Sequence, residues 1–235
     1  MSDPIFLPGG RDARGTLDAV ADDDERGPSR GNADSAATAN ACVVACPPHP
    51  QHGGTRRDQR LRAVSDELSE RKIDCLRFDY GPWDGGRGER TDVCNAVAWA
   101  RERYDRVALF GFSFGGALAL SAANNGAAVD AVAALAPPAR LGTERSDPDA
   151  PDNPDVGGVD AVADLDEMSA DLPVQILYGT RDDVADVGPV VAAARKRGFA
   201  VVEFAADHFF VGQEAKVADA VVDFLEPPLQ AEDSR

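Results

Sequence analysis

The stretch at residues 107–120 constrains the fold more than any other part of the sequence. An apolar run rich in strand-forming residues ends at Gly111, and a run rich in Leu and Ala begins at Phe114, as in a buried helix. The turn between them has the pattern Gly-x-Ser-x-Gly, with Ser113 at its centre. Side chains at Gly111 and Gly115 would clash in so tight a strand-to-helix turn. The pattern therefore predicts a strained Ser113 whose exposed hydroxyl is a candidate nucleophile.

This interpretation of the motif has two alternatives. Gly-x-Ser-x-Gly also occurs by chance, and a glycine-rich turn before a helix can simply bind phosphate. The position of the motif between a strand pattern and a helix pattern favours the nucleophile, because the chemistry requires that context. The helix that follows would direct its free N–H groups at the reacting centre. We expect the N–H of Phe114 to be one donor to an oxyanion.

Strand and helix patterns alternate from residue 41 onward, which predicts an α/β fold. We expect a mostly parallel sheet of eight strands with helices on both faces and little or no cap. The expected strands cover residues 5–7, 14–20, 41–46, 73–79, 107–110, 129–136, 174–178 and 200–204. The expected helices cover residues 56–71, 89–103, 114–123, 159–170, 187–197 and 213–225.

The length of 235 residues suits a single domain over residues 1–235. Within this domain, residues 139–172 form an insertion that is a candidate small lid over the site. The segment is rich in Pro, Asp and Gly up to residue 158 and is expected to be irregular there. The tail at residues 227–235 begins with two prolines and is polar, so we expect it to fray.

Composition limits the class of protein and its compartment. Hydrophobic residues make up 43% of the chain, which is too many for a disordered protein. No apolar run reaches the ~18 residues that a membrane-spanning helix needs. Residues 1–4 show no basic region followed by an apolar stretch, as a signal peptide would have. We therefore expect a cytoplasmic protein.

The charge of the chain is strongly negative, at −17, and lysine occurs only at positions 72, 196 and 216. Such a surface would repel nucleic acid and anionic membranes, so we expect neither as a partner. Acidic, lysine-poor surfaces are typical of proteins from salt-loaded cytoplasms, where dense carboxylates keep a protein hydrated. The sequence therefore favours a halophilic protein over an ordinary acidic one.

Two loops after the serine turn carry candidate partners for Ser113. Asp182 follows the predicted strand at 174–178, and His208 follows the one at 200–204. Functional side chains gather at the carboxyl ends of parallel strands, so these residues are expected beside Ser113. His208 would act as the base and Asp182 would orient it. The alternatives are a loop histidine bonded to backbone and a turn-forming aspartate.

The third loop, at residues 47–54, follows the predicted strand at 41–46. It is where a second oxyanion N–H is expected, and either Gln51 or His52 is the candidate donor. Cys46, His49 and His52 are spaced like metal ligands, but no fourth ligand is evident, so no metal is expected. The four cysteines form no Cys-x-x-Cys pair and are expected to be buried free thiols.

Five short motifs carry a resemblance to a known family. They read His-Pro-Gln-His-Gly-Gly at 49–54, Arg-Phe-Asp-Tyr-Gly-Pro at 77–82, Gly-Arg-Gly-Glu-Arg-Thr-Asp at 86–92, Gly-Phe-Ser-Phe-Gly-Gly at 111–116 and His-Phe-Phe-Val-Gly at 208–212. From about residue 42 to 225 the chain resembles the α/β-hydrolase superfamily. More closely, it resembles a small branch near the dienelactone hydrolases and acyl-peptidase-like esterases.

The resemblance implies an α/β-hydrolase fold and a Ser-Asp-His triad in that chain order. Gly81-Pro82 stands where the family has Arg-Gly, in a loop that borders the active site. Tyr80 and Trp83 of this loop are the candidate substrate-binding residues. Dienelactone hydrolases use a cysteine nucleophile, whereas residue 113 is serine, so that specific activity is not implied.

Two classes of function follow from these residues. The first is a carboxylesterase-like serine hydrolase that cleaves a small ester, thioester or amide through an acyl-enzyme on Ser113, without cofactor or metal. The second is a catalytically idle hydrolase fold that acts as a binding protein, because fold does not fix function. The presence of all three residue types of a triad favours the enzyme. The sequence does not predict the oligomeric state.

Salt should stabilise the folded chain, because repulsion among the carboxylates opposes the compact state. Dissolved ions screen this repulsion, and the Debye length falls to about 3 Å at 1 M salt. The melting temperature, followed by circular dichroism, should therefore rise as KCl increases from tens of millimolar to molar. A melting temperature that stays flat over this range would contradict the halophilic interpretation.

Overall fold

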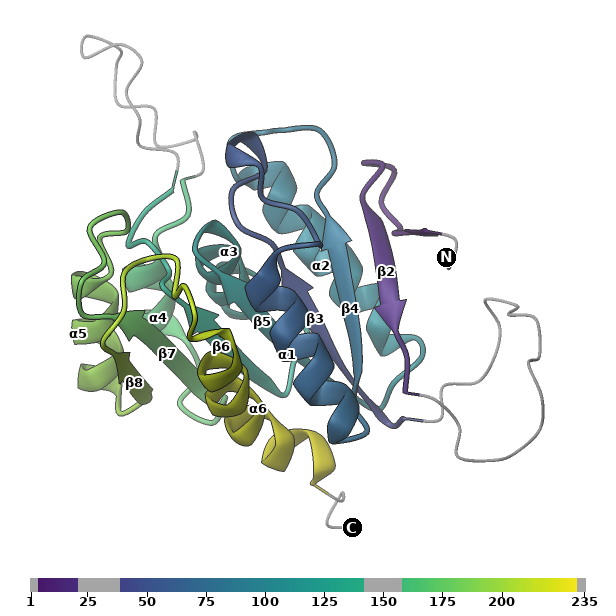
Figure 1. Ribbon diagram of the computed structural model, residues 1–235. Helices are drawn as coiled ribbons and strands as arrows, with labels where there is room; N and C mark the ends of the chain where they lie inside the picture. Colours follow the sequence, from purple (N-terminus) through teal and green to yellow (C-terminus); the bar gives the residue numbers. More distant parts are fainter. Residues whose placement is uncertain (1–3, 21–38, 142–157, 232–235) are drawn as a thin grey trace, which may run out of the picture.

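The computed structural model describes residues 4–20, 39–141 and 158–231. These residues form one sheet of eight strands in the order β1-β2-β4-β3-β5-β6-β7-β8. The strands are β1 (Ile5–Phe6), β2 (Arg14–Asp18), β3 (Ala41–Cys46), β4 (Asp74–Asp79), β5 (Arg106–Phe112), β6 (Ala131–Leu135), β7 (Val174–Gly179) and β8 (Ala200–Phe204). Strands β3 to β8 are parallel, and the hairpin of β1 and β2 joins β4 in antiparallel orientation (Figure 1). The predicted α/β class and mostly parallel eight-stranded sheet are confirmed.

The alternation of side chains along the central strands explains the two helical layers. Cys42 and Val44 of β3 belong to the core on one face of the sheet, whereas Val43 and Ala45 belong to the core on the other. Four helices cover the first face: α2 (Arg87–Arg101), α3 (Phe114–Asn124), α4 (Ala161–Glu167) and α5 (Gly188–Arg197). Helices α1 (Gln59–Glu70) and α6 (Glu214–Gln230) cover the second (Figure 1). Within the described residues, no helix has the length and apolar character that crossing a membrane requires.

The last helix is longer than the sequence predicts. Helix α6 continues through Pro227 and Pro228 to Gln230, although each proline lacks the N–H of a helical hydrogen bond. Leu225 and Leu229 are buried in the core beneath this end of the helix, and their packing holds it on the sheet. The expectation of a frayed tail is therefore wrong for residues 227–230, and residues 232–235 lie outside the described part of the chain.

The candidate lid at residues 139–172 is described only at its two ends, because residues 142–157 lie outside the described residues. Arg140 and Asp160 form an isolated bridge and an ion pair that join the two ends. Helix α4 then packs against α3 and α5, so this part of the segment belongs to the helical layer. The lid itself stays a prediction.

The parallel arrangement puts the carboxyl ends of β3 to β8 at one edge of the sheet. Ser113 follows the last residue of β5 directly, Asp182 comes three residues after β7, and His208 comes four residues after β8. Strands β7 and β8 are neighbours, and only β6 separates β7 from β5. The three loops therefore meet at this edge.

Candidate active site

The turn at Ser113 has the strained backbone that the sequence predicts. Its φ is 54° and its ψ is −119°, in a region that residues with a side chain rarely adopt. The N–H of Ser113 donates to the carbonyl of Leu135 in the neighbouring strand at 2.8 Å, which anchors the turn. A Cβ at Gly111 would overlap the backbone of Gly115, and one at Gly115 would overlap the carbonyl oxygens of Cys46 and Pro47. Only glycine fits at these two positions.

The structure brings His208 and Asp182 to Ser113. His208 Nε2 lies 3.0 Å from Ser113 Oγ, and His208 Nδ1 lies 2.8 Å from Asp182 Oδ2. An ionised carboxylate only accepts hydrogen bonds, so Nδ1 carries the hydrogen and Nε2 is left to accept the serine proton. The side chains of Asp182 and His208 are 0% and 4% exposed, which strengthens the electrostatic interaction between them.

The loop after β7 holds the Asp182 carboxylate in one orientation. Its Oδ1 accepts hydrogen bonds from the N–H groups of Val184 and Ala185 at 3.0 and 2.9 Å, which leaves Oδ2 to face His208. The neighbouring Asp183 and Asp186 are exposed. Of the three aspartates in this loop, Asp182 is therefore the one in contact with the histidine.

His208 is held by a turn of its own and by packing. Asp207 Oδ1 accepts from the N–H groups of Phe209 and Phe210, which folds the chain back just after the histidine. The ring of Phe112 lies against the imidazole, with 5.2 Å between centroids. The guanidinium of Arg60 lies over the Phe112 ring at 4.3 Å from its centroid, and it donates a hydrogen bond to the carbonyl of Phe209 at 2.9 Å. No sequence signal points to Arg60, because 149 residues separate it from Phe209.

The predicted oxyanion donors differ in their geometry. The N–H of Phe114 is the first of helix α3 and has no acceptor within that helix. By contrast, Gln51 donates its N–H to His49 Nδ1 at 3.2 Å, and His52 donates to the His49 carbonyl at 3.0 Å. Both bonds close a single 3₁₀ turn that begins at Pro50, so these two N–H groups are engaged within the loop.

The two candidate substrate-binding residues lie on a wall of aromatic rings in tilted and edge-on contact around Phe114, the residue that follows Ser113. The ring of Phe114 contacts His49, Trp83 and Tyr80, with centroids 4.7, 5.7 and 5.8 Å away. Trp83 is 41% exposed, whereas Tyr80 is partly buried and donates its hydroxyl to the Pro47 carbonyl at 3.0 Å. Desolvation raises the pKa of Tyr80, so its hydroxyl stays a neutral donor. Trp83 thus exposes part of its ring, whereas the Tyr80 hydroxyl is engaged within the protein, and the binding of a substrate by either residue stays a prediction.

The metal alternative gains no support from the geometry. Cys46 is fully buried as the last residue of β3, and burial raises the pKa of its thiol, whereas a metal binds the thiolate. The rings of His49 and His52 stack face to face at 4.4 Å. Among the described residues, no group of three or more His, Cys, Asp or Glu is arranged to hold a metal ion.

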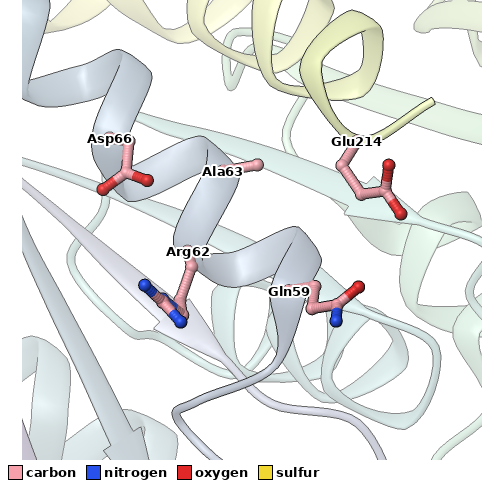
Figure 2. A pocket seen from close by; sticks show the side chains of 5 residues that line it. All are labelled: Gln59, Arg62, Ala63, Asp66 and Glu214. Carbon is pink, nitrogen blue, oxygen red and sulfur yellow. The ribbon is translucent and has the colours of Figure 1, made fainter. Parts of the chain in front are cut away.

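A shallow pocket lies elsewhere, between the first turns of α1 and the start of α6 (Figure 2). Its lining consists of Gln59, Arg62, Ala63, Asp66 and Glu214. Among the described hydrogen bonds, none joins these five side chains to Ser113, Asp182 or His208. We assign this pocket no part in the chemistry at Ser113.

Comparisons with known proteins identify the fold. The sequence matches no family model, and a search of curated proteins finds no significant match. Among solved structures, an α/β serine hydrolase without lid from Xanthomonas campestris is similar, with a TM-score of 0.71 and 21% identity over 98% of this chain and 96% of that chain. An α/β serine hydrolase homologue from Coxiella burnetii has a TM-score of 0.70 and 22% identity over 94% of this chain and 96% of that chain. Est1E from Butyrivibrio proteoclasticus has a TM-score of 0.72 and 17% identity over 98% of this chain and 100% of that chain.

The chain has the α/β-hydrolase fold. The likeness covers nearly the whole length of both partners in each comparison, so the fold extends over the sheet and both helical layers. The closer resemblance to the dienelactone-like branch stays a prediction. Within an α/β-hydrolase fold, the hydrogen-bonded Ser113, His208 and Asp182 lie at the carboxyl ends of the strands, where ligands bind in open α/β sheets.

The tight contact at Gly115 predicts that a larger residue at this position destabilises the fold. Gly115→Ala should lower the free energy of unfolding by at least about 2 kcal/mol, because the new methyl group overlaps two carbonyl oxygens. Gly188→Ala is the matched control, since its Cβ would meet nothing closer than 4.0 Å. Chemical denaturation of both variants measures the difference. Equal stability of the two would show that the turn does not need the glycine.

Proposed function

We propose that this chain is a serine hydrolase that cleaves a small ester, thioester or amide through an acyl-enzyme on Ser113. The observation that supports this most is the continuous hydrogen-bonded chain from Ser113 Oγ through His208 to Asp182, at 3.0 and 2.8 Å. Solved structures of the same fold are named serine hydrolases and esterases, which supports hydrolase chemistry in general.

In the first half of the proposed reaction, Ser113 Oγ attacks the carbonyl carbon of the substrate. His208 Nε2 takes the hydroxyl proton and then donates it to the leaving alcohol, thiol or amine. The imidazolium that forms in between is stabilised by the Asp182 carboxylate at Nδ1. The products of this half are the acyl-enzyme ester on Ser113 and the free leaving group.

In the second half, a water molecule replaces the leaving group. His208 Nε2 takes a proton from this water as its oxygen attacks the acyl carbon, and the proton then returns to Ser113 Oγ as the ester bond breaks. The acid is released and the serine hydroxyl is regenerated. No cofactor or metal enters either half, since the imidazole carries every proton that moves.

The oxyanion that forms in each half needs hydrogen-bond donors. We assign the Phe114 N–H to it, because this group begins helix α3 beside Ser113 and adds the positive end of the helix dipole. A second donor from the 47–54 loop would require Gln51 or His52 to release its partner within the 3₁₀ turn. An oxyanion accepts hydrogen bonds more strongly than the His49 ring nitrogen or carbonyl, so the N–H group could change its acceptor when the oxyanion forms.

The ring wall supports an apolar or aromatic group on the substrate. Trp83 exposes the largest surface of this wall, and His49 and Phe114 lie behind it. Est1E, which has a similar fold, has been solved with ferulic acid bound. Simple aryl esters, and esters of aromatic acids, are therefore the first substrates to test.

Replacing the nucleophile should abolish turnover. Ser113→Ala should reduce kcat for p-nitrophenyl acetate by several orders of magnitude, as loss of the serine in an acting triad costs about 10⁶-fold. Ser69→Ala on helix α1 is the control, because its hydroxyl bonds only a backbone carbonyl of its own helix. Initial rates and labelling with a fluorophosphonate, mapped by mass spectrometry, measure the effect. Near-normal turnover in Ser113→Ala, or an adduct on another residue, would refute the assignment.

The acid of the proposed triad can be tested by comparing two adjacent aspartates. Asp182→Asn should lower kcat by about 10⁴-fold with little change in fold, because an amide neither fixes the required tautomer nor stabilises the imidazolium. Asp183→Asn removes the same charge at the next residue, where the side chain is exposed. It should lower kcat far less than Asp182→Asn does. Both variants are assayed with the same ester, and their melting temperatures are compared. Similar losses in the two would count against Asp182.

A further inference from the structure

The segment Gly86-x-Gly88-Glu89-x-x-Asp92 has no role in the reaction described so far. It forms the start of helix α2, directly after the loop at residues 80–86 that carries Trp83. Both acidic side chains of the motif are fully buried. A buried carboxylate is costly unless it is paired and hydrogen-bonded, so its partners show what it does for the fold.

Glu89 fastens the second half of the loop. Its Oε1 accepts the N–H of Asp84 at 2.8 Å, and its Oε2 accepts the N–H of Gly86 at 2.7 Å. Both donors are backbone groups of the loop, and neither bond involves the sheet. Both oxygens of the carboxylate therefore hold the backbone of the loop in place.

Asp92 and Arg11 fasten the first half of the loop. Asp92 Oδ2 accepts the N–H of Gly81 at 2.9 Å, and its Oδ1 pairs with Arg11 Nε at 2.9 Å. Arg11 comes from the turn between β1 and β2, and its second nitrogen donates to the carbonyl of Pro82 at 2.7 Å. Burial raises the pKa of Asp92, while the Gly81 N–H and Arg11 oppose this rise.

Two glycines make room for Arg11. A Cβ at Gly81 would overlap the Arg11 carbonyl oxygen, and a Cβ at Gly88 would overlap the Arg11 guanidinium. The arginine thus lies in a slot between the loop and the first turn of α2. This packing also accounts for glycine at position 81, where the resembled family has arginine.

We propose that Glu89, Asp92 and Arg11 are positioning residues that hold the 80–86 loop at both ends and thereby fix Trp83 on the substrate side of Ser113. Trp83 lies between the two fastening points, with Gly81 and Pro82 before it and Asp84 and Gly86 after it. Its ring reaches His49 at 4.7 Å and Phe114 at 5.7 Å. The part of this proposal that concerns substrate choice rests on the proposed function.

The consequence for the reaction is a division of roles. The three positioning residues touch neither Ser113 nor His208 in any described hydrogen bond, so their loss leaves proton transfer intact. Their loss would instead change the position of Trp83, and with it the surface that contacts the acyl group of the substrate. We therefore expect altered discrimination between short and long acyl groups, carried mainly by KM.

The test compares three variants with one matched control. Glu89→Gln replaces an acceptor oxygen by an NH₂ group that cannot accept, Asp92→Asn does the same at the other end, and Arg11→Lys keeps the charge but loses the forked contact. Asp74→Asn is the control: Asp74 is also buried and also accepts one backbone N–H and one side chain, but at the opposite end of β4. All are made in a Trp99→Phe background, where Trp83 is the one remaining tryptophan.

The first measurement needs no catalysis. Acrylamide quenching of Trp83 fluorescence should increase by about twofold in Glu89→Gln and Asp92→Asn, because the loop opens locally, and should stay unchanged in Asp74→Asn. Unchanged quenching in the loop variants, or an equal increase in the control, would overturn the proposal. If the two carboxylate variants fail to fold, the same quenching measurement is made on Arg11→Lys, which retains a cation beside Asp92. Increased quenching in this variant supports the proposal, and unchanged quenching overturns it.

The second measurement tests substrate choice. The ratio of kcat/KM for p-nitrophenyl hexanoate and p-nitrophenyl acetate should change by about fivefold or more in the loop variants, while kcat for the acetate stays close to that of the parent. An unchanged ratio together with increased quenching would overturn the role in specificity. A parent protein that cleaves neither ester would count against the proposed function, and the quenching result would still decide the positioning of Trp83.

Discussion

The close approach of two backbone segments is the constraint on which the site depends. The turn after β5 presses against the end of β3 so tightly that a methyl group at Gly115 would overlap the carbonyls of Cys46 and Pro47. This contact forces Ser113 into a positive φ and turns the chain from strand into helix within three residues. It also aligns the start of α3 with the serine hydroxyl. The strain at one residue is tolerated because the strands on both sides and helix α3 are buried.

The order of the strands brings Asp182 and His208, the other two members of the proposed triad, close to each other. Because β7 and β8 are adjacent and parallel, the loops that follow them emerge side by side. Short turns then fix the directions: two N–H groups hold Asp182, and Asp207 folds the chain behind His208. The geometry of the proposed triad is therefore set largely by short-range hydrogen bonds between these two aspartate side chains and the backbone N–H groups just after them.

Much of this arrangement could be predicted from the sequence, because the relevant signals are local. Ser113, Asp182 and His208 each follow a recognisable strand, and their order along the chain matches one type of triad. Contacts between distant segments could not be predicted. Arg11 meets Asp92 across 81 residues, and no pattern in either segment indicates the other. The prediction of a frayed tail failed for a related reason: the local proline signal was outweighed by the burial of Leu225 and Leu229.

The two antiparallel strands at the edge of the sheet have a consequence for how such a site can change. Their connecting turn contributes Arg11 to the loop after β4, on the β3–β4 side of Ser113, whereas the histidine and aspartate come from the β7–β8 side. Under the proposed function, the positioning of Trp83 and the proposed histidine and aspartate would thus lie on opposite sides of strand β5, which carries Ser113 at its end. If the proposal holds, substitutions in the β1–β2 turn, the 80–86 loop and the start of α2 can alter which molecules are accepted while Ser113, Asp182 and His208 stay unchanged. Such a separation makes this end of the sheet the natural place for selection, or an engineer, to diversify the protein.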